Sequence, residues 1–125
     1  MTENIKPIAE WNFFQESDAS FNDKNVLVPG EKIITTYKTL IDIAIFTNKR
    51  LIVKNRDGIS DEDAKIFSLP YSSIVMWSTK DCAGNSPLDI GTEVELWTKA
   101  GYIKIGLTKD IDIFKFERLL AEGIL

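Results

Sequence analysis

The stretch from Ile45 to Val53 constrains the fold of this chain more than any other part of the sequence. It places two apolar segments on either side of a polar break of only four residues, Thr47 to Arg50. Asn48 takes a positive φ angle more cheaply than most residues other than glycine, so we expect it at the corner of a tight hairpin. The stretch therefore predicts antiparallel β-structure in this part of the chain.

The length and composition are those of a single globular domain. The chain has 125 residues, of which 44% are hydrophobic and 27% are charged, and this is ordinary for a protein with a packed core. The 15 Lys and Arg residues against 19 Asp and Glu residues give a net charge of −4. This charge argues against nucleic acid as a partner, because binding phosphates needs a basic surface. It gives no general attraction to anionic membranes, but it leaves a local basic patch open.

The sequence also favours a cytoplasmic location. The first residues, Met1 to Pro7, lack the basic and then apolar order of a signal peptide. No apolar run approaches the roughly 20 residues that span a bilayer. The single cysteine, Cys82, excludes an intrachain disulfide and fits a reducing compartment. We therefore expect a cytoplasmic protein that is not integral to a membrane.

From Glu31 onward the apolar residues alternate with the period of β-strands, and turn residues separate the segments. Seven strands are predicted, over Lys32 to Leu40, Asp42 to Thr47, Arg50 to Asn55, Lys65 to Leu69, Ile74 to Ser78, Glu93 to Trp97 and Tyr102 to Leu107. Seven short antiparallel strands are typical of a bent, barrel-like sheet.

The C-terminal segment is predicted to form one amphipathic α-helix. Thr108 or Asp110 can cap its N-terminus, and Gly123 is expected to end it. Its apolar stripe consists of residues at helical spacing, namely Ile113, Phe114, Phe116, Leu119 and Leu120. An apolar stripe must be buried, so we expect the helix to cover an open end of the sheet. The predicted fold class is mainly β with a C-terminal helix, as a bent seven-stranded antiparallel barrel capped by that helix.

Residues 1–25 differ from the rest and are predicted to be an N-terminal extension, partly helical or loose, before a domain over residues 26–125. Aromatic residues stand here among Asp, Asn, Ser and Glu, namely Trp11, Phe13, Phe14 and Phe21. Such a segment can pack on the domain, pack on another subunit or stay loose. Residues 22–28 can form a short helical turn, which Pro29-Gly30 would stop.

Three sequence blocks are fairly specific when they are taken together. They are Leu27-Val28-Pro29-Gly30-Glu31-Lys32-Ile33 with Tyr37-Lys38, then Phe46-Thr47-Asn48-Lys49-Arg50-Leu51-Ile52, and then Leu69-Pro70-Tyr71-Ser72-Ser73-Ile74 with Glu93-Val94-Glu95-Leu96. Their combination resembles the bacterial pleckstrin-homology (PH) domain family over Val26 to Leu125. The resemblance implies a PH barrel with a C-terminal helix, assembly into ring-like homo-oligomers and no established biochemical role.

The composition excludes several kinds of catalysis and metal binding. The chain has no histidine and one cysteine, which excludes histidine-dependent nucleophilic catalysis and a structural zinc site. The acidic segment from Asn55 to Asp63 hints at a calcium loop, but Val53 and Ala64 stand where carboxylates are required. We therefore expect no enzyme activity, no cofactor and no metal. A small enzyme that uses carboxylates is a third alternative, and it would need two close carboxylates in a deep pocket.

Trp97 is the strongest candidate for a contact surface in the sequence. Val94 and Leu96 are expected to face the core, so Trp97 shares the outward face with Glu93 and Glu95. Trp and Tyr are enriched at protein interfaces. The further interface candidates are Trp77, Trp11, Phe13 and Phe14, with burial in the core as the alternative for each.

The densest basic region lies on and beside one predicted strand and comprises Lys49, Arg50, Lys54 and Arg56. Three of these residues share a strand face, which makes the group a candidate anion contact, with a solvated face as the alternative. Eukaryotic PH domains that bind phosphoinositides use a basic cluster in the first hairpin loop. That loop is neutral to acidic here, from Thr39 to Asp42, which argues against inositol-lipid binding.

The main functional hypothesis is a non-enzymatic PH-like domain that self-associates as an assembly or protein-interaction module. Its expected partner is a second copy of itself, in a ring-like homo-oligomer if head-to-tail contacts close, and another protein is left open. The alternative is a module that binds an anionic head group or a membrane surface through the basic strand face. Peripheral membrane contact is thus left open, and nucleic acid is not expected.

Overall fold

The computed structural model describes residues 6–17, 26–40, 43–56, 64–82 and 89–125. In chain order its elements are β1 (Ala9–Phe13), β2 (Gln15–Ser17), β3 (Ile33–Lys38), β4 (Ile43–Thr47), β5 (Arg50–Arg56), β6 (Ala64–Pro70), a short 3₁₀ turn η2 (Tyr71–Ser73), β7 (Ile74–Asp81), β8 (Ile90–Thr98), β9 (Gly101–Thr108) and α1 (Ile113–Ile124). The seven strands predicted from the sequence are present as β3 to β9. Two further strands precede them in the described part of the chain.

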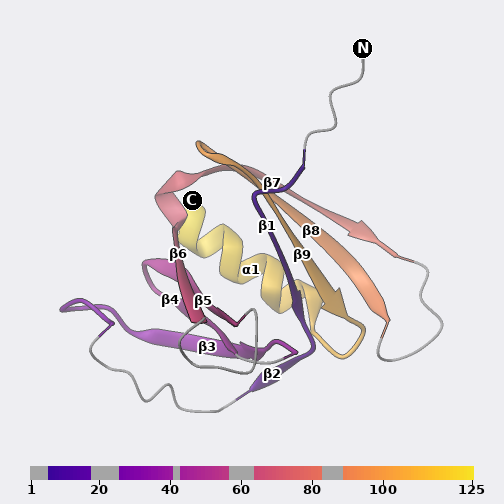
Figure 1. Cartoon of the computed structure of the whole chain (residues 1–125), viewed down its shortest axis with the longest axis horizontal. Coiled ribbons are helices and arrows are strands. Elements are labelled where there is room, and N and C mark those ends of the chain that lie inside the picture. The colour runs from indigo at the N-terminus through magenta and orange to yellow at the C-terminus, as the bar shows by residue number, and fades with distance from the viewer. Residues whose placement is uncertain (1–5, 18–25, 41–42, 57–63, 83–88) are drawn as a thin grey trace.

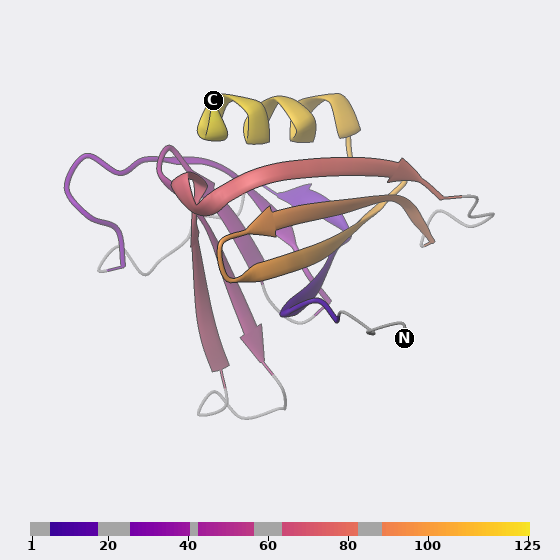
Figure 2. The same cartoon turned by 90° about the horizontal axis from the view of Figure 1, so that it is seen from above.

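The strands form two sheets, which diverge from one another in Figures 1 and 2, rather than one closed seven-stranded barrel. The first sheet has the order β1-β9-β8-β7, and the second has the order β2-β3-β4-β5-β6. The chain passes between them twice, from β1 to β2 and from β6 through η2 to β7. Pro70 ends β6 without an N–H to donate, and the 3₁₀ turn then redirects the chain, so β6 and β7 do not pair.

The N-terminal residues are part of both sheets, which corrects the expected extension over residues 1–25. β1 pairs in parallel with β9, and β2 pairs antiparallel with β3. The cause is an alternating pattern in β1, where Trp11 and Phe13 are buried while Glu10 and Asn12 are exposed. Of the helical turn predicted over residues 22–28, residues 22–25 and also Phe21 lie outside the described residues, and residues 26–28 are not helical.

The predicted C-terminal helix is confirmed, and Figure 2 shows it lying across one open side between the two sheets. Its cap is Asp112, whose Oδ1 accepts hydrogen bonds from the N–H groups of Phe114 and Lys115 at 3.0 and 3.2 Å. The cap was expected at Thr108 or Asp110, but the Thr108 hydroxyl instead donates to the carbonyl of Phe14. The helix thus begins later than predicted.

The helix contacts the core through part of the predicted stripe. Phe116, Leu119 and Leu120 are buried, but Phe114 is 83% exposed, because it points away from both sheets. The Phe116 ring lies 5.3 to 6.2 Å from three buried aromatic rings of the two sheets, Phe13, Tyr37 and Phe46.

Gly123 lies within the helix instead of ending it. A Cβ atom at this position would lie only 2.6 Å from the ring of Tyr71, so glycine permits the close approach of α1 to η2.

Candidate interaction surface

Trp97 lies on the outward face of the first sheet, on the side of β8 where the sequence placed it. Val94 and Leu96 are fully buried, while Glu93, Glu95 and Trp97 are half-buried on the opposite face. The geometry therefore leaves part of a large aromatic side chain at the surface. Whether that surface contacts a second molecule stays a prediction.

Two neighbours extend Trp97 into an apolar row across three strands. Trp97 is paired in register with Met76 of β7 and Tyr102 of β9. The rings of Trp97 and Tyr102 are stacked, with centroids 6.5 Å apart and an interplanar angle of 30°. Met76 is 54% exposed. We call Met76, Trp97 and Tyr102 the Trp97 row.

The sequence did contain a signal for one of these neighbours. The turn at Lys99-Ala100 has only two residues, so it fixes the pair Thr98–Gly101 and places Tyr102 opposite Trp97. No comparable signal identified Met76, because a register shift between Ile74 and Met76 decides which side of β7 it occupies.

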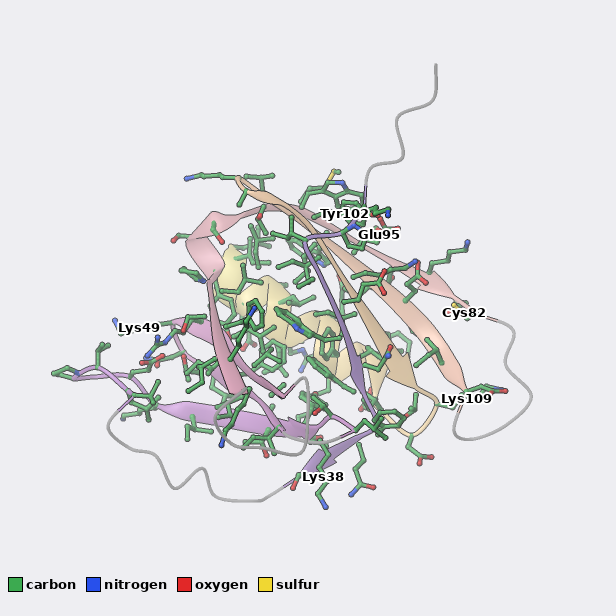
Figure 3. The ribbon with its side chains drawn as sticks, viewed as in Figure 1. Lys38, Lys49, Cys82, Glu95, Tyr102 and Lys109 are labelled. Carbon is green, nitrogen blue, oxygen red and sulfur yellow. The ribbon has the colours of Figure 1, made fainter. Side chains whose placement is uncertain are left out.

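Charged residues flank the Trp97 row on the same face. Lys104 of β9 forms an ion pair with Glu93 of β8 at 3.4 Å, and the negative charge of Glu93 raises the pKa of Lys104. Figure 3 shows Tyr102 and Glu95, which belong to β9 and β8, in one region of the molecule. An apolar centre with a charged surround is the arrangement found in protein interfaces.

Trp77 belongs to the opposite face of the first sheet and is not part of the Trp97 row. It is half-buried against the core, and its Nε1 donates a hydrogen bond to Oε1 of Glu117 on α1 at 3.0 Å. The other oxygen, Oε2, is buried and has no hydrogen-bond partner among the described residues. This contact fixes Trp77 between β7 and the helix, which separates it from the surface that Trp97 occupies.

The N-terminal aromatic candidates are also placed inside the molecule. Trp11 is 6% exposed and Phe13 is fully buried, so both pack between the sheets instead of joining the outward surface expected for them. Phe14 is half-buried at the corner between the sheets, where its N–H donates to the carbonyl of Lys38. The structure therefore does not bring the five aromatic candidates together on one surface.

One of the basic candidates, Arg50, is also held within the molecule. Arg50 forms a bidentate ion pair with Glu31, with Nε 2.9 Å from Oε2 and Nη2 3.0 Å from Oε1. Nη2 also donates to the carbonyl of Val26 and Nη1 to the hydroxyl of Ser68. With its guanidinium held by these groups, Arg50 is a structural residue in this conformation rather than a phosphate contact.

The Glu31 carboxylate is the centre of this network. Its side chain is fully buried, and it accepts further hydrogen bonds from the Thr47 hydroxyl at 2.6 Å and the Val28 N–H at 3.1 Å. Hydrogen bonding to Arg50 is the main cause that lowers the pKa of Glu31 to about 2, against the opposing effect of burial. Glu31 is therefore ionised and paired at neutral pH.

The three motif blocks of the sequence meet around this ion pair. The Asn48 side chain accepts from the N–H of Lys32 at 2.7 Å and donates to the carbonyl of Gly30 at 3.2 Å. The Tyr71 hydroxyl donates to the carbonyl of Thr47 at 2.7 Å, and burial raises the pKa of this hydroxyl. The motif residues thus connect distant turns to one another.

The sequence predicted that Asn48 takes a positive φ angle at the hairpin corner, and this prediction is wrong. Among the described residues no residue other than glycine has a positive φ angle. Asn48 instead serves through its side-chain hydrogen bonds to the segment before β3.

The other basic candidates differ in their exposure. Lys49 is exposed at the β4–β5 turn, Lys54 is half-buried on β5, and the side chain of Arg56 lies outside the described residues. Figure 3 shows Lys38, Lys49 and Lys109 well apart from one another. Among the described basic candidates, Lys49 is the one whose side chain is exposed.

Metal binding and acid–base chemistry receive no support from the described residues. No group of three or more Cys, Asp or Glu side chains is close enough to hold a metal ion there. The acidic loop considered for calcium lies mainly outside the described residues. A pocket of about 190 Å³ contains Glu10 and Glu93, but Glu93 is paired with Lys104 in it. Cys82, which is half-buried, also lines this pocket.

Two divergent sheets with a C-terminal helix across their open side define a PH-like domain. Two solved structures share this fold: a DUF1696 family protein with a pleckstrin-homology domain from Shewanella loihica PV-4 and a pleckstrin-homology domain from Shewanella amazonensis SB2B. The first has a TM-score of 0.72 at 23% identity and covers 81% of this chain and 86% of its own. The second has a TM-score of 0.64 at 25% identity and covers 87% of this chain and 94% of its own.

The family can be stated more closely. The family model "Bacterial PH domain" matches residues 4–124, and the chain belongs to this family. The uncharacterized protein YjqA of Bacillus subtilis (strain 168) is 31% identical over 100 residues, which are 78% of each chain. The uncharacterized protein YozO of the same organism is 29% identical over 99 residues, which are 79% of this chain and 83% of YozO.

The family match starts before the boundary expected at residue 26 and includes β1 and β2. PH domains are generally interaction modules without enzyme activity, and the role of the matched relatives is not known. In the described ranges no helix is long and apolar enough to cross a membrane.

Proposed function

We propose that this chain is a non-enzymatic interaction module that binds further copies of itself through the Trp97 row. The observation that carries the proposal is the outward Trp97 ring, which is stacked on Tyr102 beside the exposed Met76. A cytoplasmic location, as expected from the sequence, fits this role.

The row has the chemistry of an interface centre. Trp and Tyr supply large apolar contact areas with few rotatable bonds, and interface energy concentrates in such residues. The row lies opposite the buried face of the same strands, so the core holds it rigidly. A ring-like homo-oligomer would need this row to meet a different surface of the next copy, with a rotation that closes.

The mass in solution tests the proposal. Light scattering after size exclusion, at two protein concentrations, is expected to give a multiple of the 14.2 kDa chain mass. Trp97→Ala is expected to lower this mass toward that of the monomer, because it removes the centre of the contact. Phe114→Ala is the matched control, because Phe114 is an aromatic residue 83% exposed on α1 and outside the Trp97 row.

Two results would refute the proposal. One is a monomer at both concentrations. The other is an oligomer whose mass is the same in the parent chain and in Trp97→Ala, which would place the contact elsewhere. Circular dichroism of each variant shows whether a change in mass comes from loss of the fold.

The alternative function, recognition of an anionic head group, has weaker support. Arg50 is held by Glu31, which leaves Lys49 and Lys54 as the described members of the basic strand face. Sedimentation with anionic liposomes at low salt measures binding to a membrane surface. Salt-sensitive binding that Lys49→Glu abolishes would favour this alternative.

A further inference from the structure

Four strands in the described residues lie at the edge of a sheet, and they differ in how well their edges are protected. β2 has only three residues, and β6 contains Lys65 and ends at Pro70. β7 has a register shift near Met76 and contains Lys80. Short length, lysine, proline and bulges are the usual features that prevent an edge from pairing with another chain. β1, with the sequence Ala-Glu-Trp-Asn-Phe, has none of them.

The backbone of β1 offers hydrogen-bonding groups on its open side. Phe14, directly after β1, donates its N–H to the carbonyl of Lys38 in the second sheet, away from β9. Backbone N–H and C=O groups point to alternate sides along a strand, so those of Glu10 and Asn12 also point away from β9. These groups therefore face the gap between β1 and the second sheet.

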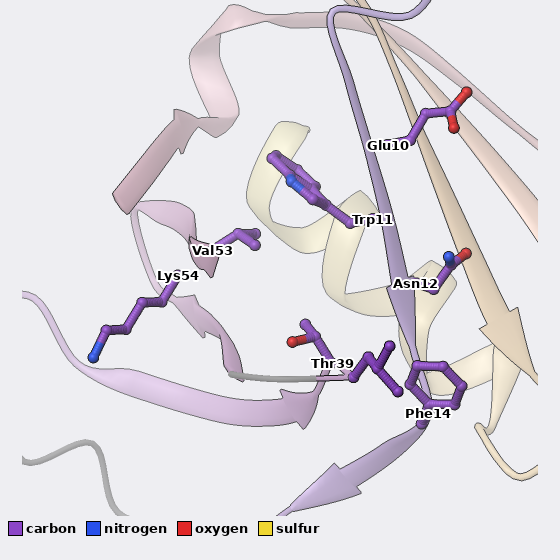
Figure 4. Close-up of a pocket in the computed structure, with 8 residues that line it drawn as sticks. Glu10, Trp11, Asn12, Phe14, Thr39, Val53 and Lys54 are labelled. Atoms are coloured by element: carbon purple, nitrogen blue, oxygen red, sulfur yellow. The ribbon is translucent and has the colours of Figure 1, made fainter. Parts of the chain in front are cut away.

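Two apolar pockets lie along this open edge, one on each side of the Trp11 ring. The first has a volume of about 220 Å³ and is lined by residues that include Asn12, Phe14 and Val53 (Figure 4). The second has a volume of about 320 Å³ and is lined by residues that include Ala9, Phe67, Leu69 and Ile103. Trp11 lines both pockets and contacts Phe67, with ring centroids 5.7 Å apart.

The charges at the pockets indicate what kind of segment would fit. Lys54 and Glu10 both line the first pocket, so their charges offset one another there, and Figure 4 shows the Lys54 side chain pointing away from Trp11. Lys99 lines the second pocket, whose described lining contains no Asp or Glu. The cation beside the second pocket complements an apolar side chain with a carboxylate next to it.

We propose that the open edge of β1 binds an extended segment of another protein as an additional strand of the first sheet. Main-chain hydrogen bonds to Glu10 and Asn12 align the segment, and its side chains on one face enter the two pockets. Side chains two positions apart share a face of a strand, which matches a row of pockets along one edge. An acidic residue of the segment faces Lys99. This site is separate from the Trp97 row and does not depend on self-association.

Selection of peptides on the full chain tests the inference. The probe is a displayed library of random peptides about nine residues long, which is enough to span β1. We expect selected peptides to alternate apolar and polar residues and to contain Asp or Glu. In hydrogen exchange, the amides of Glu10 and Asn12 are expected to become protected when a selected peptide is bound.

Matched substitutions at one position separate the backbone contribution from that of the side chain. Glu10→Pro removes an N–H from the open edge, where proline is tolerated, and is expected to weaken binding at least about tenfold. Glu10→Thr removes the same side chain but keeps the N–H, so its affinity should stay within about twofold of the parent chain. Lys99→Glu tests the charge without altering β1 and should weaken binding several-fold. Lys80→Glu, the same change on β7, is its control.

Four outcomes would overturn the inference. One is a library that yields no peptide preferring the parent chain over Glu10→Pro, and another is selected peptides that bind both equally. A third is a fall in oligomeric mass in Glu10→Pro, which would mean that the edge binds a second copy. The last is displacement of the bound peptide by decanoate at a lower concentration than competing free peptide requires. This would indicate that the pockets bind a small aliphatic ligand. If Glu10→Pro does not fold, as judged by circular dichroism, the Lys99→Glu and Lys80→Glu pair decides.

Discussion

At the scale of single residues, the ion pair between Glu31 and Arg50 shows how sequence motifs that are far apart in the chain contact one another. Glu31 follows one turn, Arg50 begins the strand after another, and Tyr71 belongs to η2. The buried carboxylate is satisfied only when Arg50, Thr47 and Val28 are all in place. A buried charge without its partner costs more than the pair gains, so these residues act as a unit.

Removing the carboxylate charge is the first prediction. Glu31→Gln should lower the free energy of unfolding by about 2 to 3 kcal/mol at neutral pH, because Arg50 would stay largely buried without a counter-charge. Urea unfolding measures this. Glu122→Gln, the same change at an exposed helix position, should change the free energy by less than about 0.5 kcal/mol.

The same pair predicts how stability depends on pH. Hydrogen bonding to Arg50 lowers the pKa of Glu31 to about 2, so this carboxylate binds a proton less readily in the folded state than in the unfolded state. The stabilisation is therefore complete above about pH 5 and lost as the pH falls toward 2. Glu31→Gln should lose less stability than the parent chain over this range. Equal losses in both proteins would show that other carboxylates control acid unfolding.

At the scale of elements, the helix start shows how a tertiary contact selects one cap from several candidates. Thr108, Asp110 and Asp112 all have capping side chains. The Thr108 hydroxyl donates to Phe14, which leaves the chain extended at the end of β9. Asp112 then accepts the two free N–H groups of the first helical turn.

The cap gives the third prediction. Asp112→Ala should lower the free energy of unfolding by about 1 kcal/mol, since two backbone N–H groups lose their acceptor. Asp110→Ala, which was an equally good cap from the sequence, should change it by less than about 0.5 kcal/mol. Thermal and urea unfolding of both variants measure the difference. A larger effect at Asp110 would contradict the assignment of the cap.

At the scale of the whole molecule, β1 and β2 connect the two sheets. β1 adds to the first sheet and β2 to the second, and the aromatic side chains of Trp11 and Phe13 fill the space between them. The domain therefore begins well before the boundary that the strand pattern suggested. Such a link makes the stability of each sheet depend on the other.

A shortened chain gives the fourth prediction. A chain that begins at Val26 should show no cooperative unfolding transition, since the loss of each buried large aromatic costs about 3 to 5 kcal/mol. The total stability of a domain is about 5 to 15 kcal/mol. A chain that begins at Lys6 keeps both strands and is the control for shortening. Circular dichroism during heating measures both, and a cooperative transition in the shorter chain would show that residues 26–125 form an independent domain.

Local patterns predicted most of the elements because they depend on neighbouring residues. Alternation predicted β3 to β9, the spacing of Phe116 and Leu120 predicted the helix, and the alternation around Val94 placed Trp97 outward. Trp11 and Phe13 show the same alternation, yet their strands were missed, because polar neighbours weakened the pattern and the partner strand β9 is about 90 residues away.

The sequence by itself determined the succession of β3 to β9 along the chain, the amphipathic helix and the absence of histidine chemistry, since each depends on composition or on residues close together in the chain. Tertiary structure decided that Arg50 pairs with Glu31, that Met76 joins Trp97, and that the open edge of β1 adjoins two pockets. These features depend on sheet register and on contacts between segments far apart in sequence, which no local pattern specifies.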